Sequence, residues 1–143
     1  MTLTVRYVDA NFIQQIWPLV KGYIEESVDK GLPYPESSKC YNADHILQFL
    51  TSSQQLLLVA IDEDGKIHGA ATISFINYPL HRAAVITAIG GKLVTSKNTF
   101  EQMRQILAQR GATIIQAMCR PSMVRYLQRF NFEPRNTLVE VLI

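Results

Sequence analysis

The sequence contains few cysteines and no long apolar run. Cys40 and Cys119 stand far apart, without the spacing of a metal-binding or redox motif. Two isolated thiols argue against a disulfide framework and indicate a reduced, cytosolic setting. No apolar stretch approaches the roughly 20 residues that cross a membrane, and the first ten residues, MTLTVRYVDA, lack the apolar core of a secretory signal. We therefore expect a cytoplasmic protein without a metal site or a membrane partner.

Charged residues are also scarce. They make up 18% of the chain against 48% hydrophobic residues, a balance typical of globular proteins rather than disordered ones. A length of 143 residues is that of one ordinary domain with a sizeable core. Because no linker, repeat or low-complexity segment interrupts it, we expect a single domain over residues 1–143.

The charges are unevenly distributed. Residues 1–91 contain six Lys or Arg and nine Asp or Glu, a net charge of −3, whereas residues 92–143 contain eight and three, a net charge of +5. A basic second part suits an anionic partner, such as a diphosphate, an acidic protein surface or nucleic acid. A solvated basic face without a ligand is the alternative.

Apolar patterns predict the elements of the fold. Apolar residues at spacings of three and four, from Ile13 to Val28, predict a helix, which Asp9 or Asn11 caps and Pro18 kinks or restarts. Residues 31–35 end that helix, and Asn42 caps a second. Gly65 closes a hairpin turn that needs a positive φ angle. The remaining predicted helices are 98–111 and 121–131, and the predicted strands are 3–8, 55–61, 66–76, 82–94, 113–119 and 132–143.

The order of these elements is β-α-α-β-β-β-α-β-α-β. Long hairpins followed by a βαβ crossover predict an α/β (α+β) fold with a mixed, mostly antiparallel sheet and helices on both faces. In this sheet we expect strand 82–94 to be central and parallel to strand 113–119.

The order over the last third resembles the acyl-CoA-binding half of the GCN5-related N-acetyltransferases, the GNAT superfamily. The resemblance implies acetyl-CoA as the cofactor, held by a Q/R-x-x-G-x-G/A loop after the fourth strand. The corresponding segment, KLVTSKNT, contains no glycine. Gly90 and Gly91 precede it within the predicted strand and are expected to form a bulge. The residues that remain for cofactor binding are Lys92, Val94, Ser96, Lys97, Asn98 and Thr99.

The same segment leads into a predicted helix. Asn98 followed by Glu101 fits a capping box, with Ser96 or Thr95 as the alternative cap. A carboxylate in that position would compete with a diphosphate for the N–H groups of the helix.

The resemblance also implies a tyrosine acid on the last helix and a carboxylate base on the fourth strand. The tyrosine is expected four residues before the Gly-Phe pair, which reads Asn131-Phe132 here. That position holds Leu127, and Tyr126 lies one residue earlier, about 100° around a helix. Strand 82–94 contains no Asp or Glu. The catalytic candidates that remain are Tyr126, His81 and Cys119, with His68 as a further titratable group, and each has a packing role as its alternative.

The segment from Arg120 to Phe132 is similar to the R-x-x-x-x-R-x-L-x-x-x-G-F ending of GNAT-like proteins of tailed phages and prophages, some of which are virion components. Arg125 and Arg129 are spaced to share one helix face, with Arg120 near its start. We expect these arginines to dock an acidic protein partner, with solubility and salt bridges as the alternative.

Three functions follow from these features. We favour a GNAT-fold binding or assembly module with a degenerate acetyl-CoA site. The phage resemblance implies a phage-encoded protein located in the host cytoplasm or in the virion. A homo-oligomer is one assembly that such a module could form. The alternative is a divergent acetyl-CoA-dependent N-acetyltransferase acting on a small-molecule or protein amine. Nucleic-acid binding has less support, because the chain lacks basic stretches interleaved with aromatic residues.

Overall fold

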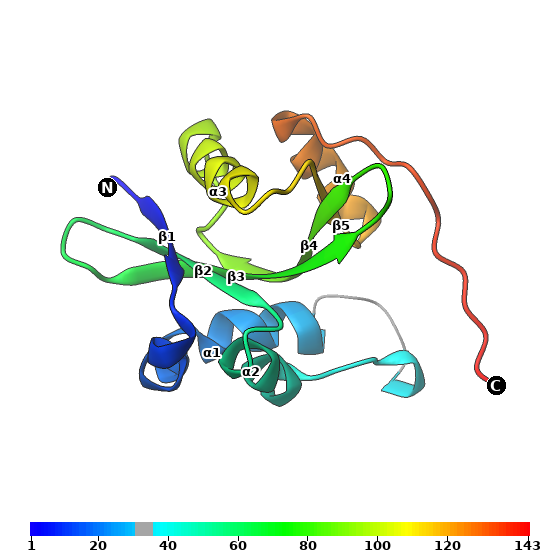
Figure 1. Ribbon diagram of the computed structural model, residues 1–143, viewed down its shortest axis with the longest axis horizontal. Helices are drawn as coiled ribbons and strands as arrows, with labels where there is room; N and C mark the ends of the chain where they lie inside the picture. Colours follow the sequence, from blue (N-terminus) through cyan, green and yellow to red (C-terminus); the bar gives the residue numbers. More distant parts are fainter. Residues whose placement is uncertain (31–35) are drawn as a thin grey trace.

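The structure, a computed structural model, describes residues 1–30 and 36–143. It is a mixed α/β fold in which helices cover both faces of one twisted sheet (Figure 1). The elements in the described residues are β1 (Thr4–Val8), the 3₁₀ turn η1 (Ala10–Phe12), α1 (Ile13–Lys30), η2 (Glu36–Ser38), α2 (Ala43–Thr51), β2 (Leu56–Ile61), β3 (Ile67–Asn77), β4 (Arg82–Gly91), α3 (Lys97–Gln109), β5 (Ile114–Ala117), α4 (Pro121–Leu127) and η3 (Gln128–Phe130).

The sheet confirms the predicted topology up to the last strand. Its order is β1-β2-β3-β4-β5, with antiparallel pairs except between β4 and β5, which run parallel. The β4-α3-β5 crossover produces this parallel pair, as predicted for strands 82–94 and 113–119. The edge at β1 is covered by α3, because the Gln102 side chain accepts from the N–H of Val5 and donates to the carbonyl of Leu3, at 2.8 and 3.2 Å.

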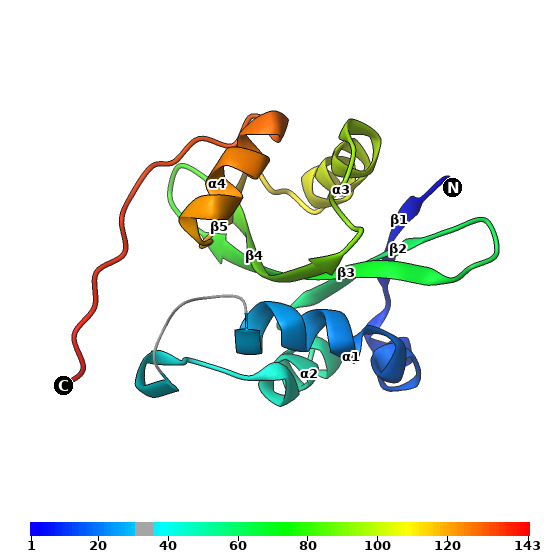
Figure 2. The ribbon, with the colours of Figure 1, turned by 180° about the vertical axis from the view of Figure 1, so that it is seen from behind.

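Each face of the sheet carries its own apolar core. Helices α1 and α2 pack on one face and α3 and α4 on the other, as both views show (Figures 1 and 2). The helical spacing of the first stripe explains the first core, since Ile13, Trp17, Val20 and Ile24 are all buried. In the second core, the buried side chains of Met103 and Leu107 of α3 cluster with buried residues of β3 and β4.

Local signals in the sequence account for most element ends. Asp9 caps η1 by accepting from the N–H of Asn11, and Asn42 caps α2 through a capping box with His45. Gly65 has a φ angle of +82° in the hairpin turn, as predicted. Helix α1 runs through Pro18 without a restart. The helix end predicted over residues 31–35 lies outside the described residues.

The last predicted strand, 132–143, is wrong. This segment forms no strand and leaves the body of the protein as an extended trace (Figure 1). Leu138, Val139, Val141 and Leu142 are exposed along it. An apolar pattern makes a strand only where a neighbouring edge pairs with it, and this segment runs away from β5 instead. As a result β5 is an edge strand, and β3 rather than strand 82–94 is the middle strand of the sheet.

No helix within residues 1–30 and 36–143 has both the length and the apolar character needed to cross a membrane.

Candidate functional site

Among the described residues, no strand pairs with the end of β4 that leads into α3 on its β5 side. The parallel register pairs residues 83–86 of β4 with β5 and then stops, while β4 continues through residues 87–91. We call residues 87–91 the open end of β4. The acyl-CoA resemblance locates the cofactor diphosphate at the segment after this strand and at the helix N-terminus, so the contacts of the open end and of that segment decide what the site can bind.

A bulge marks the beginning of the open end. Thr72 of β3 is opposite Ala88 and Ile73 is opposite Ile86, so Thr87 is the extra residue. Its hydroxyl lies 2.7 Å from the hydroxyl of the fully buried Thr72 and donates to Oε1 of Gln55 at 2.9 Å. The bulge is therefore held by a satisfied polar network, and the bulge predicted at Gly90 and Gly91 is wrong.

The two glycines serve a different purpose. An added Cβ at Gly90 would lie 2.5 Å from the carbonyl oxygen of Tyr23, and one at Gly91 would lie 2.7 Å from a ring carbon of the same tyrosine. Gly91 also has a φ angle of +67°. The absence of side chains at these two positions lets α1 approach the backbone of β4 closely.

Side chains from the α1 and α2 side bind the main chain of the open end. The Ser27 hydroxyl of α1 accepts from the N–H of Ile89 at 3.0 Å. The Tyr41 hydroxyl donates to the carbonyl of Thr87 at 3.4 Å. Burial, and secondarily the nearby Cys40 thiol, raise the pKa of Tyr41, which keeps this hydroxyl protonated as a donor. These main-chain groups therefore already have partners within the protein.

The connection from β4 to α3 also turns inward. Leu93 and Val94 are buried, and the N-cap of α3 is Ser96, whose hydroxyl accepts from the N–H of Thr99 at 3.2 Å. The buried Thr99 hydroxyl accepts in return from the N–H groups of Ser96 and Thr95, at 3.3 and 3.4 Å. The segment thus uses several of its N–H groups internally instead of presenting them as an anion cradle.

The capping box predicted from Asn98 and Glu101 is wrong. Helix α3 begins one residue before Asn98, so Asn98 is already inside its first turn. Glu101 instead pairs with Arg104 at 3.4 Å on the exposed side. Lys92, Lys97 and Asn98 are exposed. A small hollow of about 260 Å³ lies beside the helix start, lined by Thr95, Ser96, Asn98, Thr99 and residues 1–3.

Tyr126 connects α4 to the same segment. Its hydroxyl donates to the carbonyl of Val94, and its ring packs edge-on against Phe130 with centroids 5.7 Å apart. The hydroxyl is thus engaged in joining the last helix to the β4–α3 connection. This contact joins residues 32 positions apart, and nothing local in the sequence signals it.

The other two catalytic candidates lie in different places. His81 precedes β4, at the end opposite to Gly91, and its Nδ1 is 2.9 Å from the hydroxyl of Thr113. Cys119 follows β5 and is half-buried, and burial raises the pKa of its thiol. A raised thiol pKa lowers the thiolate fraction that a nucleophile needs. The structure does not bring Tyr126, His81 and Cys119 together as a catalytic group.

The three arginines of the last helix are exposed. Arg120 is the N-cap of α4 and Arg125 lies in its last turn. Helix α4 ends at Leu127, so Arg129 lies in η3, with its guanidinium carbon 5.6 Å from the centre of the Tyr126 ring. The helical face predicted for Arg125 and Arg129 is therefore interrupted, because the chain tightens into a 3₁₀ turn before Asn131 adopts a φ angle of +68°. Within the described residues none of the three forms an ion pair.

Solved structures share the fold over nearly the whole chain. A predicted acetyltransferase from Clostridium acetobutylicum, solved with acetyl-CoA, is 14% identical with a TM-score of 0.63, and the match covers 99% of this chain and 96% of that one. An aminoglycoside acetyltransferase from an uncultured soil sample is 14% identical with a TM-score of 0.67, covering 100% and 99%. A ribosomal-protein-alanine N-acetyltransferase from Brucella melitensis biovar Abortus is 14% identical with a TM-score of 0.65, covering 99% of both chains.

The fold is that of the GNAT acetyltransferases. No protein-family model and no curated protein matches the sequence. At 14% identity these structures establish the fold alone. The chemistry of the site must be inferred from the side chains of this chain. Within residues 1–30 and 36–143, no group of histidine, cysteine and carboxylate side chains is arranged to hold a metal ion.

Sequence reasoning missed Ser27, Tyr41 and the Thr72–Thr87–Gln55 network. Each joins residues that are far apart in the chain, so no spacing rule identifies the contact. The one sequence signal in this region was the absence of glycine from residues 92–99.

Proposed function

We propose that this GNAT-fold protein acts as a binding or assembly module with a degenerate acetyl-CoA site. The observation that carries the proposal is that side chains of the chain itself occupy the open end of β4 and the segment after it. Ser27 binds the N–H of Ile89, Tyr41 the carbonyl of Thr87, and Tyr126 the carbonyl of Val94.

Energetics support this reading. A ligand that uses these main-chain groups must first break existing hydrogen bonds, each with a net contribution of about 0.5–1.5 kcal/mol. It gains few amides in return, because Thr95, Ser96 and Thr99 already use their N–H groups within the capping box. Lys92 and Lys97 are exposed, and exposed charges contribute about 1 kcal/mol or less to an ion pair. Affinity for the diphosphate is therefore expected to be low.

The competing function is a divergent acetyl-CoA-dependent N-acetyltransferase. The retained fold supports it, as does the acetyl-CoA in the Clostridium acetobutylicum structure. The degenerate-site reading accounts better for the occupied open end, for a β4 without Asp or Glu, and for a Tyr126 hydroxyl that binds a carbonyl.

Calorimetric titration of the purified protein with acetyl-CoA separates these two functions. We expect weak or absent binding, with a Kd above roughly 100 µM, or about −5.5 kcal/mol. Titration of the Lys92→Gln and Lys97→Gln double variant is the matched control, because non-specific attraction to the diphosphate is lost there. Low-micromolar binding by the unchanged protein would refute the degenerate site and favour the enzyme, and the double variant shows how much of that affinity the two lysines contribute.

The partner we propose is a protein with an acidic surface, docked by Arg120, Arg125 and Arg129. All three are exposed, and residues 92–143, to which they belong, carry a net charge of +5. The resemblance of this segment to GNAT-like proteins of tailed phages favours a role in assembly, such as in a virion.

A further inference from the structure

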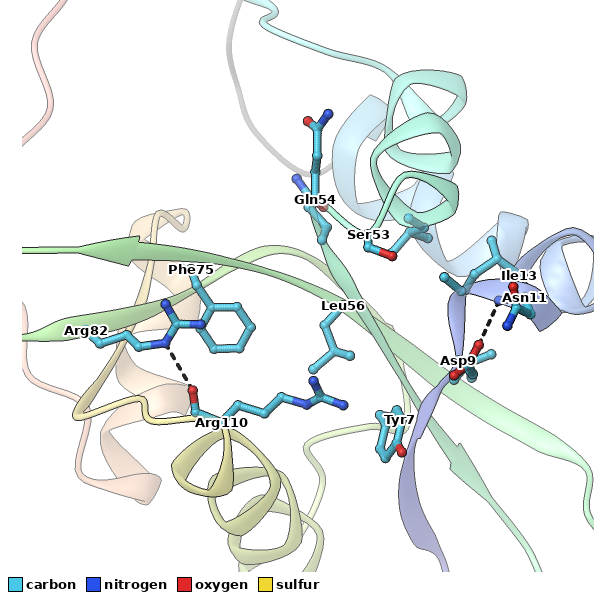
Figure 3. A pocket seen from close by; sticks show the side chains of 14 residues that line it. Tyr7, Asp9, Asn11, Ile13, Ser53, Gln54, Leu56, Phe75, Arg82 and Arg110 are labelled. Carbon is cyan, nitrogen blue, oxygen red and sulfur yellow. Dashed lines mark hydrogen bonds between the residues drawn. The ribbon is translucent and has the colours of Figure 1, made fainter.

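A second pocket lies at the other end of the sheet, where β1 ends and β4 begins. Its volume is about 620 Å³, within the range of small-molecule sites. Tyr7, Phe75, Arg82 and Arg110 line one side, and the chain after β1 and the α2–β2 connection line the other (Figure 3). The open end of β4 and the α3 N-terminus lie at the opposite end of the β4 strand, so this pocket is separate from the acyl-CoA region.

Arg82 is held rigidly at this pocket. Its Nε donates to the carbonyl of Arg110 at 3.1 Å and its Nη1 to Oδ1 of Asn77 at 2.7 Å. Its guanidinium carbon lies 4.3 Å from the centre of the Phe75 ring. A guanidinium fixed on three sides loses little conformational entropy when its remaining N–H groups bind a ligand.

Arg110 brings a second guanidinium to the same space. It is the C-cap of α3, and Gly111, at a φ angle of +88°, turns the chain directly after it. Its side chain extends from the helix end towards Tyr7 and Leu56 (Figure 3), with the guanidinium carbon 4.5 Å from the centre of the Tyr7 ring.

Neither guanidinium has a carboxylate partner in the described part of the chain. Asp9 also lines the pocket, but it accepts from the N–H of Asn11 at 2.9 Å and forms no ion pair with Arg82 or Arg110. Two guanidinium groups that line one half-enclosed pocket without a carboxylate partner give it a positive potential, which attracts an anion.

The geometry points to this pocket as a binding site for a small anionic ligand, whose carboxylate or phosphate group is bound by Arg82 and Arg110. Guanidinium groups present planar pairs of donors that match either oxyanion. The volume leaves room for the rest of the ligand against Leu56 and the polar wall of Asp9, Asn11 and Gln54. This inference does not depend on the proposed function.

Amide NMR titration of the ¹⁵N-labelled protein tests the site. Inorganic phosphate and succinate are the two probes, each at up to roughly 10 mM, enough to fill a site of millimolar Kd, with ionic strength held constant by sodium chloride. We expect at least one probe to shift the signals of residues 9–11 and 53–55. Arg82→Gln and Arg110→Gln should each weaken that binding about tenfold, the effect of losing a charged hydrogen bond.

Two variants serve as controls. Arg104→Gln removes an exposed arginine from the same helix, outside the pocket, and Lys97→Gln removes a charge at the α3 N-terminus; both should leave the titration unchanged. If only phosphate binds, the ligand carries a phosphoryl group. If only succinate binds, the ligand carries a carboxylate. The inference is overturned if neither probe shifts these signals, or if both arginine variants titrate like the unchanged protein. If the Arg82→Gln variant unfolds, titration of the Arg110→Gln variant alone decides the result, because Arg110 is exposed.

Discussion

A few hydroxyl groups determine the chemistry of the open end of β4. The hydroxyl of the fully buried Thr72 is hydrogen-bonded to the hydroxyl of Thr87, which also donates to Oε1 of Gln55. No buried polar side-chain atom in the described residues lacks a hydrogen-bond partner. Such a network stabilises one local conformation, because each lost member leaves another polar atom unsatisfied.

The middle member of that network should matter most. Thr87→Val removes both an acceptor and a donor, leaving the Thr72 hydroxyl and Oε1 of Gln55 without partners, and should cost about 1–3 kcal/mol. Thr72→Val leaves the Thr87–Gln55 bond intact and should cost about 1 kcal/mol or less. Urea unfolding of both variants measures the difference. Equal costs would show that the network does not act as a chain.

Asp62 is expected to produce a pH-dependent contribution to stability. The hydrogen bond from His68 at 2.7 Å, followed by those from the N–H groups of Lys66 and Asp64, lowers the pKa of its carboxyl group, although desolvation opposes the shift. A lowered pKa in the folded state stabilises the protein above the ordinary pKa, and this contribution is lost as pH falls through the lowered value.

Asp62→Asn should therefore be less stable than the unchanged protein at pH 7, and the difference should shrink below about pH 4. Thermal unfolding at several values of pH between about 3 and 7 measures this effect. The quantity to compare is the melting temperature of the variant minus that of the unchanged protein at each pH. Asp64→Asn, in the same turn, is the matched control, because its carboxylate takes part in none of these bonds. A difference that stays constant with pH would contradict the assignment.

At the scale of elements, the contact between α1 and β4 depends on glycine. The carbonyl of Tyr23 belongs to the helix backbone, so it cannot move away from a new side chain unless α1 moves as well. The nearby Gly22 has no atom within 4 Å of an added Cβ, so the same substitution there meets open space.

Gly90→Ala should destabilise the protein by about 1–3 kcal/mol through overpacking. Gly22→Ala should instead be neutral or stabilise it by up to about 1 kcal/mol, because alanine favours the helix. Chemical denaturation compares the two variants directly. If Gly90→Ala is as stable as Gly22→Ala, the close packing of α1 against β4 is not a constraint on the fold.

At the scale of the whole molecule, we expect the basic residues 92–143 to determine how the protein binds an acidic partner. Arg125→Glu with Arg129→Glu should leave the melting temperature nearly unchanged, because exposed charges contribute little to stability. The same change should weaken binding to immobilised polyglutamate, used as an acidic protein surface, and binding of the unchanged protein should fall as salt rises.

Arg6→Glu with Arg104→Glu is the matched control for that experiment. It makes the same change in net charge at exposed positions on β1 and α3. Equal losses in the two double variants would mean that net charge alone, and not the Arg120, Arg125 and Arg129 surface, drives binding. Unfolding of the first variant would show that these arginines are structural.

Much of the fold was predictable because its signals are local. Helix α1 follows from apolar spacing, α2 from the Asn42 cap, and the first hairpin from Gly65. The last strand was not predictable, because its pattern describes segment 132–143 alone and says nothing of whether an edge pairs with it. The bulge was assigned to Gly90 and Gly91 on backbone freedom, whereas a buried hydroxyl network located it at Thr87.

The sequence by itself determined the order of the elements as far as the last helix, the apolar face of the first helix, the positive charge of residues 92–143 and the absence of glycine from residues 92–99, since each is a property of neighbouring residues. The tertiary structure alone decided which groups meet. It placed Ser27 and Tyr41 on the open end of β4, joined Tyr126 to Val94, and brought Arg82 and Arg110 to one pocket. The physical reason is that hydrogen bonds and charge pairs act over a few ångströms, and only the packing of helices on the sheet brings distant residues that close.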